Sequence, residues 1–91
     1  MANLPFTNVR KINENQITRA AQFLRAEFGF RHTASYFRGK TRFRDQLHKD
    51  TAMSSLESEQ MVDALETRGW LQFWPSQPIR LEAGLWTLGA A

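Results

Sequence analysis

The chain has no cysteine, only two histidines and no apolar run long enough to cross a bilayer. Without cysteine there is neither a disulfide framework nor a thiolate metal site, and His32 and His48 alone are too few to build a metal site. Residues 1–5 lack the charged start and apolar core of a signal peptide. We therefore expect a cytoplasmic protein with no membrane association, no metal and no cofactor.

Catalytic groupings are equally scarce. Asp45 and His48 could share a helix face, but no activated Ser or Cys nucleophile and no third orienting group can be assigned to them. The glycines are isolated, so the chain has no Gly-rich phosphate loop. We therefore expect that the protein is not an enzyme.

Acidic residues are scarce in the first half of the chain. Residues 1–49 contain ten Lys or Arg against three Asp or Glu, whereas residues 50–91 contain two against six, so charges of +7 and −4 make up the net +3. A basic half predicts a polyanionic partner, or else an ordinary solvated surface that is attracted to the acidic half.

Two helices are predicted from capping boxes, in which a polar side chain and a residue three positions later bond each other's backbone. The pair at 13–16, Asn and Gln, opens a helix that ends at Gly29, and the pair at 54–57, Ser and Glu, opens another that ends at Gly69. Their expected inward-facing residues are Ile17, Ala20, Ala21, Leu24 and Phe28 in the first, and Leu56, Met61, Ala64 and Leu65 in the second.

Between them we predict a short strand within residues 30–38, because aromatic and β-branched side chains favour extended structure and Gly39 breaks a helix. Thr41 then caps a further helix that runs to about Lys49, with Phe43 and Leu47 as its inward pair.

We predict an N-terminal arm at residues 1–12, before the first helix. After the third helix we predict a β-hairpin. Residues 70–74 form one strand, residues 75–78 a Pro-bracketed turn, and residues 79–88 the partner strand, with a bulge at 83–84 where the alternation of apolar residues slips.

This order, and the run 61–71 with Leu65, Gly69, Trp70 and Leu71, resembles the winged-helix superfamily of bacterial regulators. In that family the third helix commonly ends in a Leu-x-x-x-Gly-hydrophobic-hydrophobic pattern before the wing. The resemblance covers about residues 14–88 and implies an α+β fold with three helices and a small antiparallel sheet, in the order helix-strand-helix-helix-strand-strand. In many relatives the third helix enters the DNA major groove and the wing touches backbone or minor groove. It therefore implies a non-catalytic transcriptional regulator that binds duplex DNA, and we expect it to act as a homodimer.

The predicted third helix is acidic where a DNA-reading helix would be basic, since it carries four Asp or Glu against Arg68. We therefore assign phosphate contacts mainly to the basic stretch before it, although that stretch could also be a solvated turn. The residues expected to contact nucleic acid are Arg38, Lys40, Arg42, Arg44 and Lys49 at phosphates, Ser55, Ser58 and Gln60 at bases, and Arg80 from the wing.

Tryptophan supplies a second candidate surface. In an extended strand Trp70, Gln72 and Trp74 face one way while Leu71 and Phe73 face the other, so a two-stranded hairpin presents large apolar groups on a free face. Trp70, Trp74 and Trp86 are predicted interface residues, covered either by the arm at residues 1–12 or by a dimer partner. The alternative function is a protein-interaction module that docks through the acidic helix and the Trp-rich hairpin and binds no nucleic acid.

Overall fold

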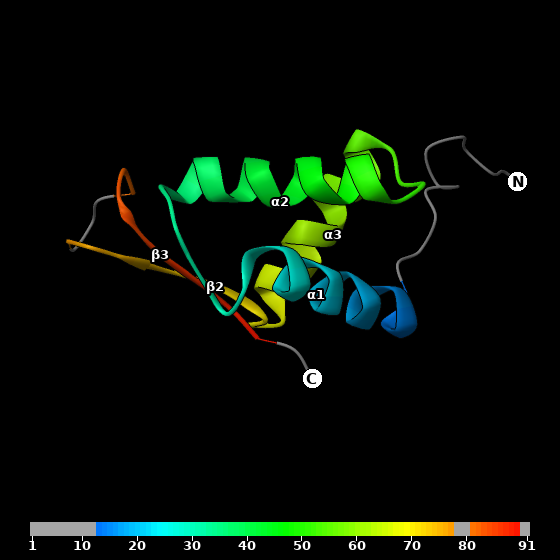
Figure 1. Ribbon diagram of the computed structural model, residues 1–91, viewed down its shortest axis with the longest axis horizontal. Helices are drawn as coiled ribbons and strands as arrows, with labels where there is room; N and C mark the ends of the chain where they lie inside the picture. Colours follow the sequence, from blue (N-terminus) through cyan, green and yellow to red (C-terminus); the bar gives the residue numbers. More distant parts are fainter. Residues whose placement is uncertain (1–12, 78–80, 90–91) are drawn as a thin grey trace, which may run out of the picture.

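The computed structural model describes residues 13–77 and 81–89. Three helices, α1 (Glu14–Phe28), α2 (Tyr36–Asp50) and α3 (Ser55–Thr67), and three strands, β1 (Arg31–Thr33), β2 (Leu71–Pro75) and β3 (Gly84–Leu88), follow one another as α1-β1-α2-α3-β2-β3. The strands form one antiparallel sheet in the order β1-β3-β2. Figure 1 shows β2 and β3 side by side, extending away from the three helices. The predicted α+β class and element order are confirmed.

Both predicted capping boxes are present. The backbone N–H of Gln16 donates to the Asn13 side chain at 2.8 Å, and the Asn13 N–H donates back to Gln16 at 3.1 Å. Ser54 and Glu57 repeat the arrangement at the start of α3. Gly29 and Gly69 follow α1 and α3 with φ of 78°, the left-handed region that glycine enters at low cost.

The start of α2 differs from the prediction, because the helix begins at Tyr36 rather than Thr41. Ser35 is its N-cap, and the Ser35 hydroxyl accepts from the backbone N–H of Arg38 at 3.1 Å. The preceding strand is correspondingly limited to β1. Gly39 lies inside α2 and faces the core, where a Cβ atom would lie 2.1 Å from Trp86 Nε1. The glycine therefore permits close packing of the helix on the sheet and does not end a helix.

Trp86 lies at the centre of the core. It is fully buried, the rings of Tyr36, Phe43 and Phe73 lie with their centroids 5.3–5.4 Å from it, and its indole N–H donates to the Ser35 carbonyl at 3.2 Å. The prediction that Trp86 belongs to an interface is therefore wrong, because no part of its side chain reaches the surface.

The inner face of α3 is rotated relative to the predicted apolar stripe. Leu56, expected inside, is 59% exposed, whereas Ser58 and Val62 are buried together with Met61 and Leu65. Buried residues at 58, 61, 62 and 65 follow the three-to-four-residue spacing of a single helix face. Leu56 lies on the opposite, outward side of the same helix.

The hairpin is regular in its described part. The β2–β3 register runs without a break from Leu71↔Leu88 to Pro75↔Gly84, so the bulge expected at 83–84 is absent from the described strand pair. Gly84 instead begins β3, where a Cβ atom would lie 2.6 Å from the Trp74 carbonyl oxygen. The predicted N-terminal arm and the centre of the predicted turn lie outside the described residues. No helix in the described part of the chain has the length and apolarity needed to cross a membrane.

Candidate nucleic-acid interface

The five cations predicted to hold phosphates lie along α2 but divide between two sides of that helix. Arg38 and Arg42 line a surface depression next to β1, and Lys49, seven residues after Arg42, lies on the same side of the helix. Lys40 and Arg44 line a different depression, on the side that faces α3. The basic residues predicted as one stretch therefore lie on two separate surfaces of α2 with different surroundings.

Arg38 and Arg42 are one helical turn apart, and both are exposed. With Thr33 and Ser35 they line a shallow depression of about 240 Å³, which Glu82 also borders. Neither guanidinium forms an ion pair with a carboxylate of the described residues. Lys49 is exposed and likewise has no such pair. We call Arg38, Arg42 and Lys49 the basic stripe.

His32 orients one member of the basic stripe. Its ring packs edge-on against Phe28 and near Phe43, and Arg42 Nη1 lies 3.1 Å from His32 Nε2. Burial, and then the positive charge of Arg42, lower the pKa of His32 below its usual 6.5. The ring is therefore neutral at pH 7, with Nε2 accepting from Arg42. Arg42 keeps its other N–H donors for an external acceptor.

Lys40 is occupied within the protein. Its ammonium lies 2.7 Å from Asp63 Oδ1 and 3.1 Å from Glu66 Oε1, and the Tyr36 hydroxyl donates to Glu66 at 2.9 Å. Burial disfavours the charged ammonium, but the hydrogen bonds and charges of both carboxylates outweigh it and raise the pKa of Lys40. Burial and Glu66 raise the pKa of Tyr36. This cluster ties α2 to α3, so Lys40 serves the fold rather than an external phosphate. Beside it, Arg44 pairs with its neighbour Asp45 at 2.9 Å.

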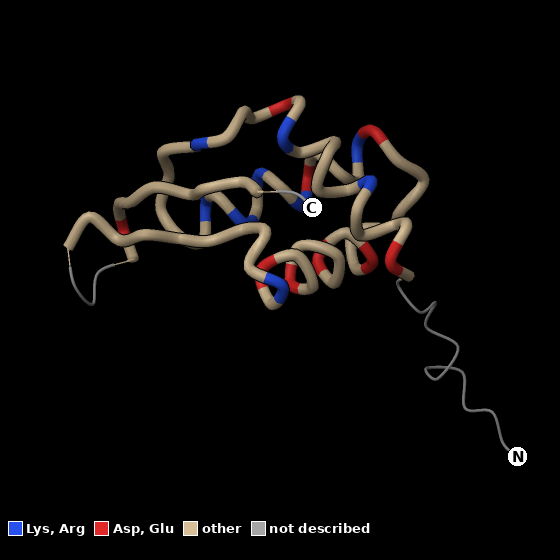
Figure 2. The backbone as a smooth tube through the Cα atoms, turned by 90° about the horizontal axis from the view of Figure 1, so that it is seen from below, with Lys and Arg blue, Asp and Glu red and all other residues tan. Residues whose placement is uncertain are grey.

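The residues expected to probe bases do not form a shared reading surface on α3. Ser58 is fully buried and its hydroxyl has no hydrogen-bond partner among the residues that the structure describes, so its assignment to base contact is wrong. Ser55 is exposed at the start of the helix, while Gln60 is half-buried and lines a groove toward α1. Acidic positions instead recur along α3 (Figure 2), with Glu59 and Asp63 on its outward side. Phosphates would meet like charge there.

The tryptophans predicted to form an interface lie in three different environments. Trp70 is half-buried against the core, Trp86 is inside it, and Trp74 is 54% exposed with its indole N–H donating to Thr87 Oγ1 at 3.0 Å. The predicted alternation is confirmed within β2, where Leu71 and Phe73 face inward and Gln72 and Trp74 outward, but Trp70 precedes the strand and packs against the core. Of the three tryptophans, only Trp74 is largely exposed to solvent. Arg80 lies outside the described residues.

One exposed apolar pair was missed from the sequence. Phe37, 67% exposed, and Leu81, 41% exposed, line the same depression next to the N-terminus of α2. The strand predicted within residues 30–38 includes Phe37, and in a strand its side chain would point to the face opposite that of its two neighbours. In the structure Phe37 belongs to α2 and points outward. Recognising Ser35 as the N-cap would have revealed this position.

The chain matches no protein-family model, and its comparison with curated proteins and with solved structures found no match. Function must therefore be inferred from the topology and the surface chemistry of the chain itself. In the described residues no group of three or more His, Asp or Glu is placed to hold a metal ion.

Proposed function

We propose that the chain is a winged-helix domain that binds duplex DNA without catalysis, through phosphate contacts made by α2. The observed element order is the one that the winged-helix resemblance implies, and the three-stranded antiparallel sheet agrees with it. The helices on either side of residues 51–54 then correspond to the helix-turn-helix, and β2 and β3 to the wing.

The observation that carries the proposal is the basic stripe. Its three cations lie on one side of α2, which Asp45 shares, and form no ion pair with a described carboxylate, whereas Lys40, Arg44 and Arg68 each form one. A guanidinium can bind a phosphate with two parallel hydrogen bonds. The hydrogen bond to His32 restricts the conformations of the Arg42 side chain, so less conformational entropy is lost when Arg42 binds a phosphate.

Contact through the basic stripe has a consequence for specificity. Phosphate contacts fix a protein on DNA but carry no direct sequence information. Because the outward side of α3 presents Glu59 and Asp63, that helix is a scaffold in this proposal and does not enter the major groove. Binding should therefore depend steeply on salt and weakly on sequence.

Fluorescence anisotropy with a labelled duplex of about 20 base pairs tests the proposal. Three phosphate contacts predict that log K falls with log salt with a slope of about −2.7, and replacing Arg38 and Arg42 by Ala should reduce that slope by about 2. The matched control replaces Arg19 and Arg25 on α1 by Ala, which changes the net charge equally and should leave the slope unchanged. Absence of binding at about 50 mM salt by a folded protein, or equal losses in both double variants, would overturn the proposal.

A second function is favoured by the exposed apolar surface. Phe37 and Leu81 line one depression, and Trp74 is exposed on the hairpin; exposed apolar side chains of this size are common in protein interfaces. We propose self-association or docking to another protein through these side chains. Sedimentation analysis over a concentration series should then show a dimer that Phe37→Ser and Trp74→Ser weaken. A monomer at every concentration, with no DNA bound, would leave a heterologous protein as the partner to seek.

A further inference from the structure

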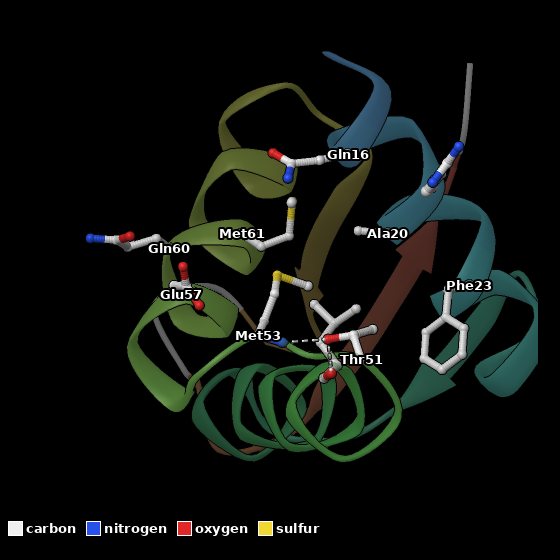
Figure 3. Close-up of a pocket in the computed structure, with 10 residues that line it drawn as sticks. Gln16, Ala20, Phe23, Thr51, Met53, Glu57, Gln60 and Met61 are labelled. Atoms are coloured by element: carbon white, nitrogen blue, oxygen red, sulfur yellow. Dashed lines mark hydrogen bonds between the residues drawn. The ribbon is translucent and has the colours of Figure 1, made fainter. Parts of the chain in front are cut away.

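A groove of about 320 Å³ opens between α1, the loop that follows α2 and the start of α3 (Figure 3). Its volume is about twice that of the cavity of roughly 150 Å³ that accommodates benzene, and lies within the range of small-molecule sites. The groove lies apart from the basic stripe, because none of its lining residues belongs to that set. Gln60, expected to read bases, is also one of its lining residues.

The inner part of the groove is apolar. Ala20 and Phe23 come from α1, Leu47 from α2, Met53 from the loop and Met61 from α3. Figure 3 shows the Met53 and Met61 thioethers pointing into the space between the helices, with the Phe23 ring at its edge. Thioether sulfurs make favourable contacts with aromatic rings, and unbranched methionines adapt to the shape between them. These walls fit a flat aromatic group better than a branched aliphatic one.

The rim of the groove supplies hydrogen-bond donors on α1. Arg19 is exposed and forms no ion pair with a described carboxylate. Gln16, one helical turn earlier, uses its Oε1 atom to accept from the Asn13 backbone, so its NH₂ group is directed elsewhere. Glu57 also lines the groove, but its carboxylate accepts from the Ser54 backbone in the capping box of α3. The cationic side of the rim is therefore α1.

We propose that this groove binds a small aromatic carboxylate. The ring lies between Met53, Met61 and Phe23, and the carboxylate accepts from the Arg19 guanidinium and the Gln16 amide. A charge-assisted bond to Arg19 gives the anion its preference over a neutral molecule of the same shape. The proposal is independent of nucleic-acid binding, because it uses a different surface and different residues.

The test uses the full chain labelled with ¹³C at the methionine methyl groups and titrated with 1-naphthoate. Ring currents should shift the Met53 and Met61 methyl signals in a saturable way, with a Kd of about 1 mM or tighter if each heavy atom contributes about −0.3 kcal/mol. Arg19→Gln should weaken 1-naphthoate about tenfold or more, whereas Arg25→Gln, on the same helix but outside the groove, should not. The neutral 1-naphthalenemethanol should bind more weakly and should not respond to Arg19→Gln.

Three results would overturn the assignment. The first is no saturable shift of either methionine up to about 10 mM, ten times the expected Kd, as when another segment of the chain fills the groove. The second is an equal loss of affinity in the two arginine variants, which would indicate a general effect of net charge. The third is equal binding of the acid and the alcohol. Arg19 is exposed, so its replacement should not unfold the protein; circular dichroism of each variant verifies this.

Discussion

Replacing Gly39 by Ala distinguishes two opposite roles for this residue. Alanine is favoured over glycine inside a helix by about 1 kcal/mol, so a glycine that merely weakens α2 would yield a more stable protein on replacement. The structure predicts the reverse. A Cβ atom at Gly39 would lie 2.1 Å from Trp86 Nε1 and 2.5 Å from Cδ1, whereas ordinary contacts begin at 3.4 Å.

The size of the loss follows from how firmly Trp86 is held. Relieving the contact needs a shift of about 1.3 Å by a fully buried indole that three aromatic rings and a hydrogen bond to Ser35 surround. Overpacking of a core costs about 1–3 kcal/mol and occasionally more. Taking the upper end and subtracting the gain in helix propensity, we expect Gly39→Ala to lower the free energy of unfolding by about 2 kcal/mol.

Thermal and urea unfolding followed by circular dichroism measure this loss. A change of about 2 kcal/mol should lower Tm by roughly 8–16 °C in a domain of this size. Thr41→Ala, at an exposed position of the same helix, is the control and should leave Tm unchanged or slightly raised. A Gly39→Ala protein as stable as the original, or more stable, would refute the close approach of α2 to Trp86.

Four further predictions concern single residues. Ser58→Ala should raise the free energy of unfolding by about 1 kcal/mol in urea unfolding, because it removes a buried hydroxyl that has no partner in the described part of the chain; a loss above 1 kcal/mol would show that the hydroxyl is bonded. Gly84→Ala should lower it by about 1–3 kcal/mol, since the new Cβ would lie 2.6 Å from the rigid Trp74 carbonyl; unchanged stability would contradict that approach. NMR titration should give His32 a pKa below 6.5, so stability should fall as the pH drops from 6.5 through that value, because the unfolded chain then binds more protons. Arg42→Gln should raise the pKa of His32 only part of the way, because burial, the larger cause, remains; no change would exclude Arg42 as a cause.

The features predicted correctly from the sequence are those fixed by short stretches of chain. The caps at Asn13 and Ser54 need only a partner three residues away, and the left-handed conformation of Gly69 follows from its place after the last apolar turn of α3. Similarly, the alternation of Leu71 with its neighbours is settled within one strand. Local spacing was therefore sufficient for element type and order.

The errors share a dependence on distant contacts. Gly39 has the usual signature of a helix breaker, and only Trp86, 47 residues further on, gives it a place inside α2. Leu56 is more apolar than Ser58, but packing against α2 and the sheet selects the face that contains Ser58. Propensity and hydrophobicity were overruled in both cases by which surfaces meet in the fold.

The candidate site was predicted in composition but not in pairing. The sequence identified a basic segment correctly, yet nothing in it indicates that Lys40 pairs with Asp63, 23 residues away, while Arg38 and Arg42 pair with no described carboxylate. Formal charge is visible in a sequence, whereas its neutralisation depends on tertiary geometry. The ion pairs formed in the folded protein decide which cations are free to bind an external phosphate.

In the proposed DNA complex, the pairing of Lys40 also limits how a duplex can approach. Lys40 pairs with Asp63 and Glu66 across the contact between α2 and α3, while Glu59 lies exposed on α3. A duplex laid across both helices, as in a major-groove reader, would bring phosphates toward Glu59 and Asp63. Arg44 would attract those phosphates only weakly, because its charge is already paired with Asp45. A duplex laid along the basic stripe would avoid Glu59 and Asp63. It would still pass Asp45, which lies on the same side of α2, and Glu82, which borders the depression of Arg38 and Arg42. In the proposed DNA complex, the ion pairs of Lys40 and Arg44 therefore favour the side of α2 next to β1, and any sequence preference would come from DNA shape or from a second bound copy rather than from α3.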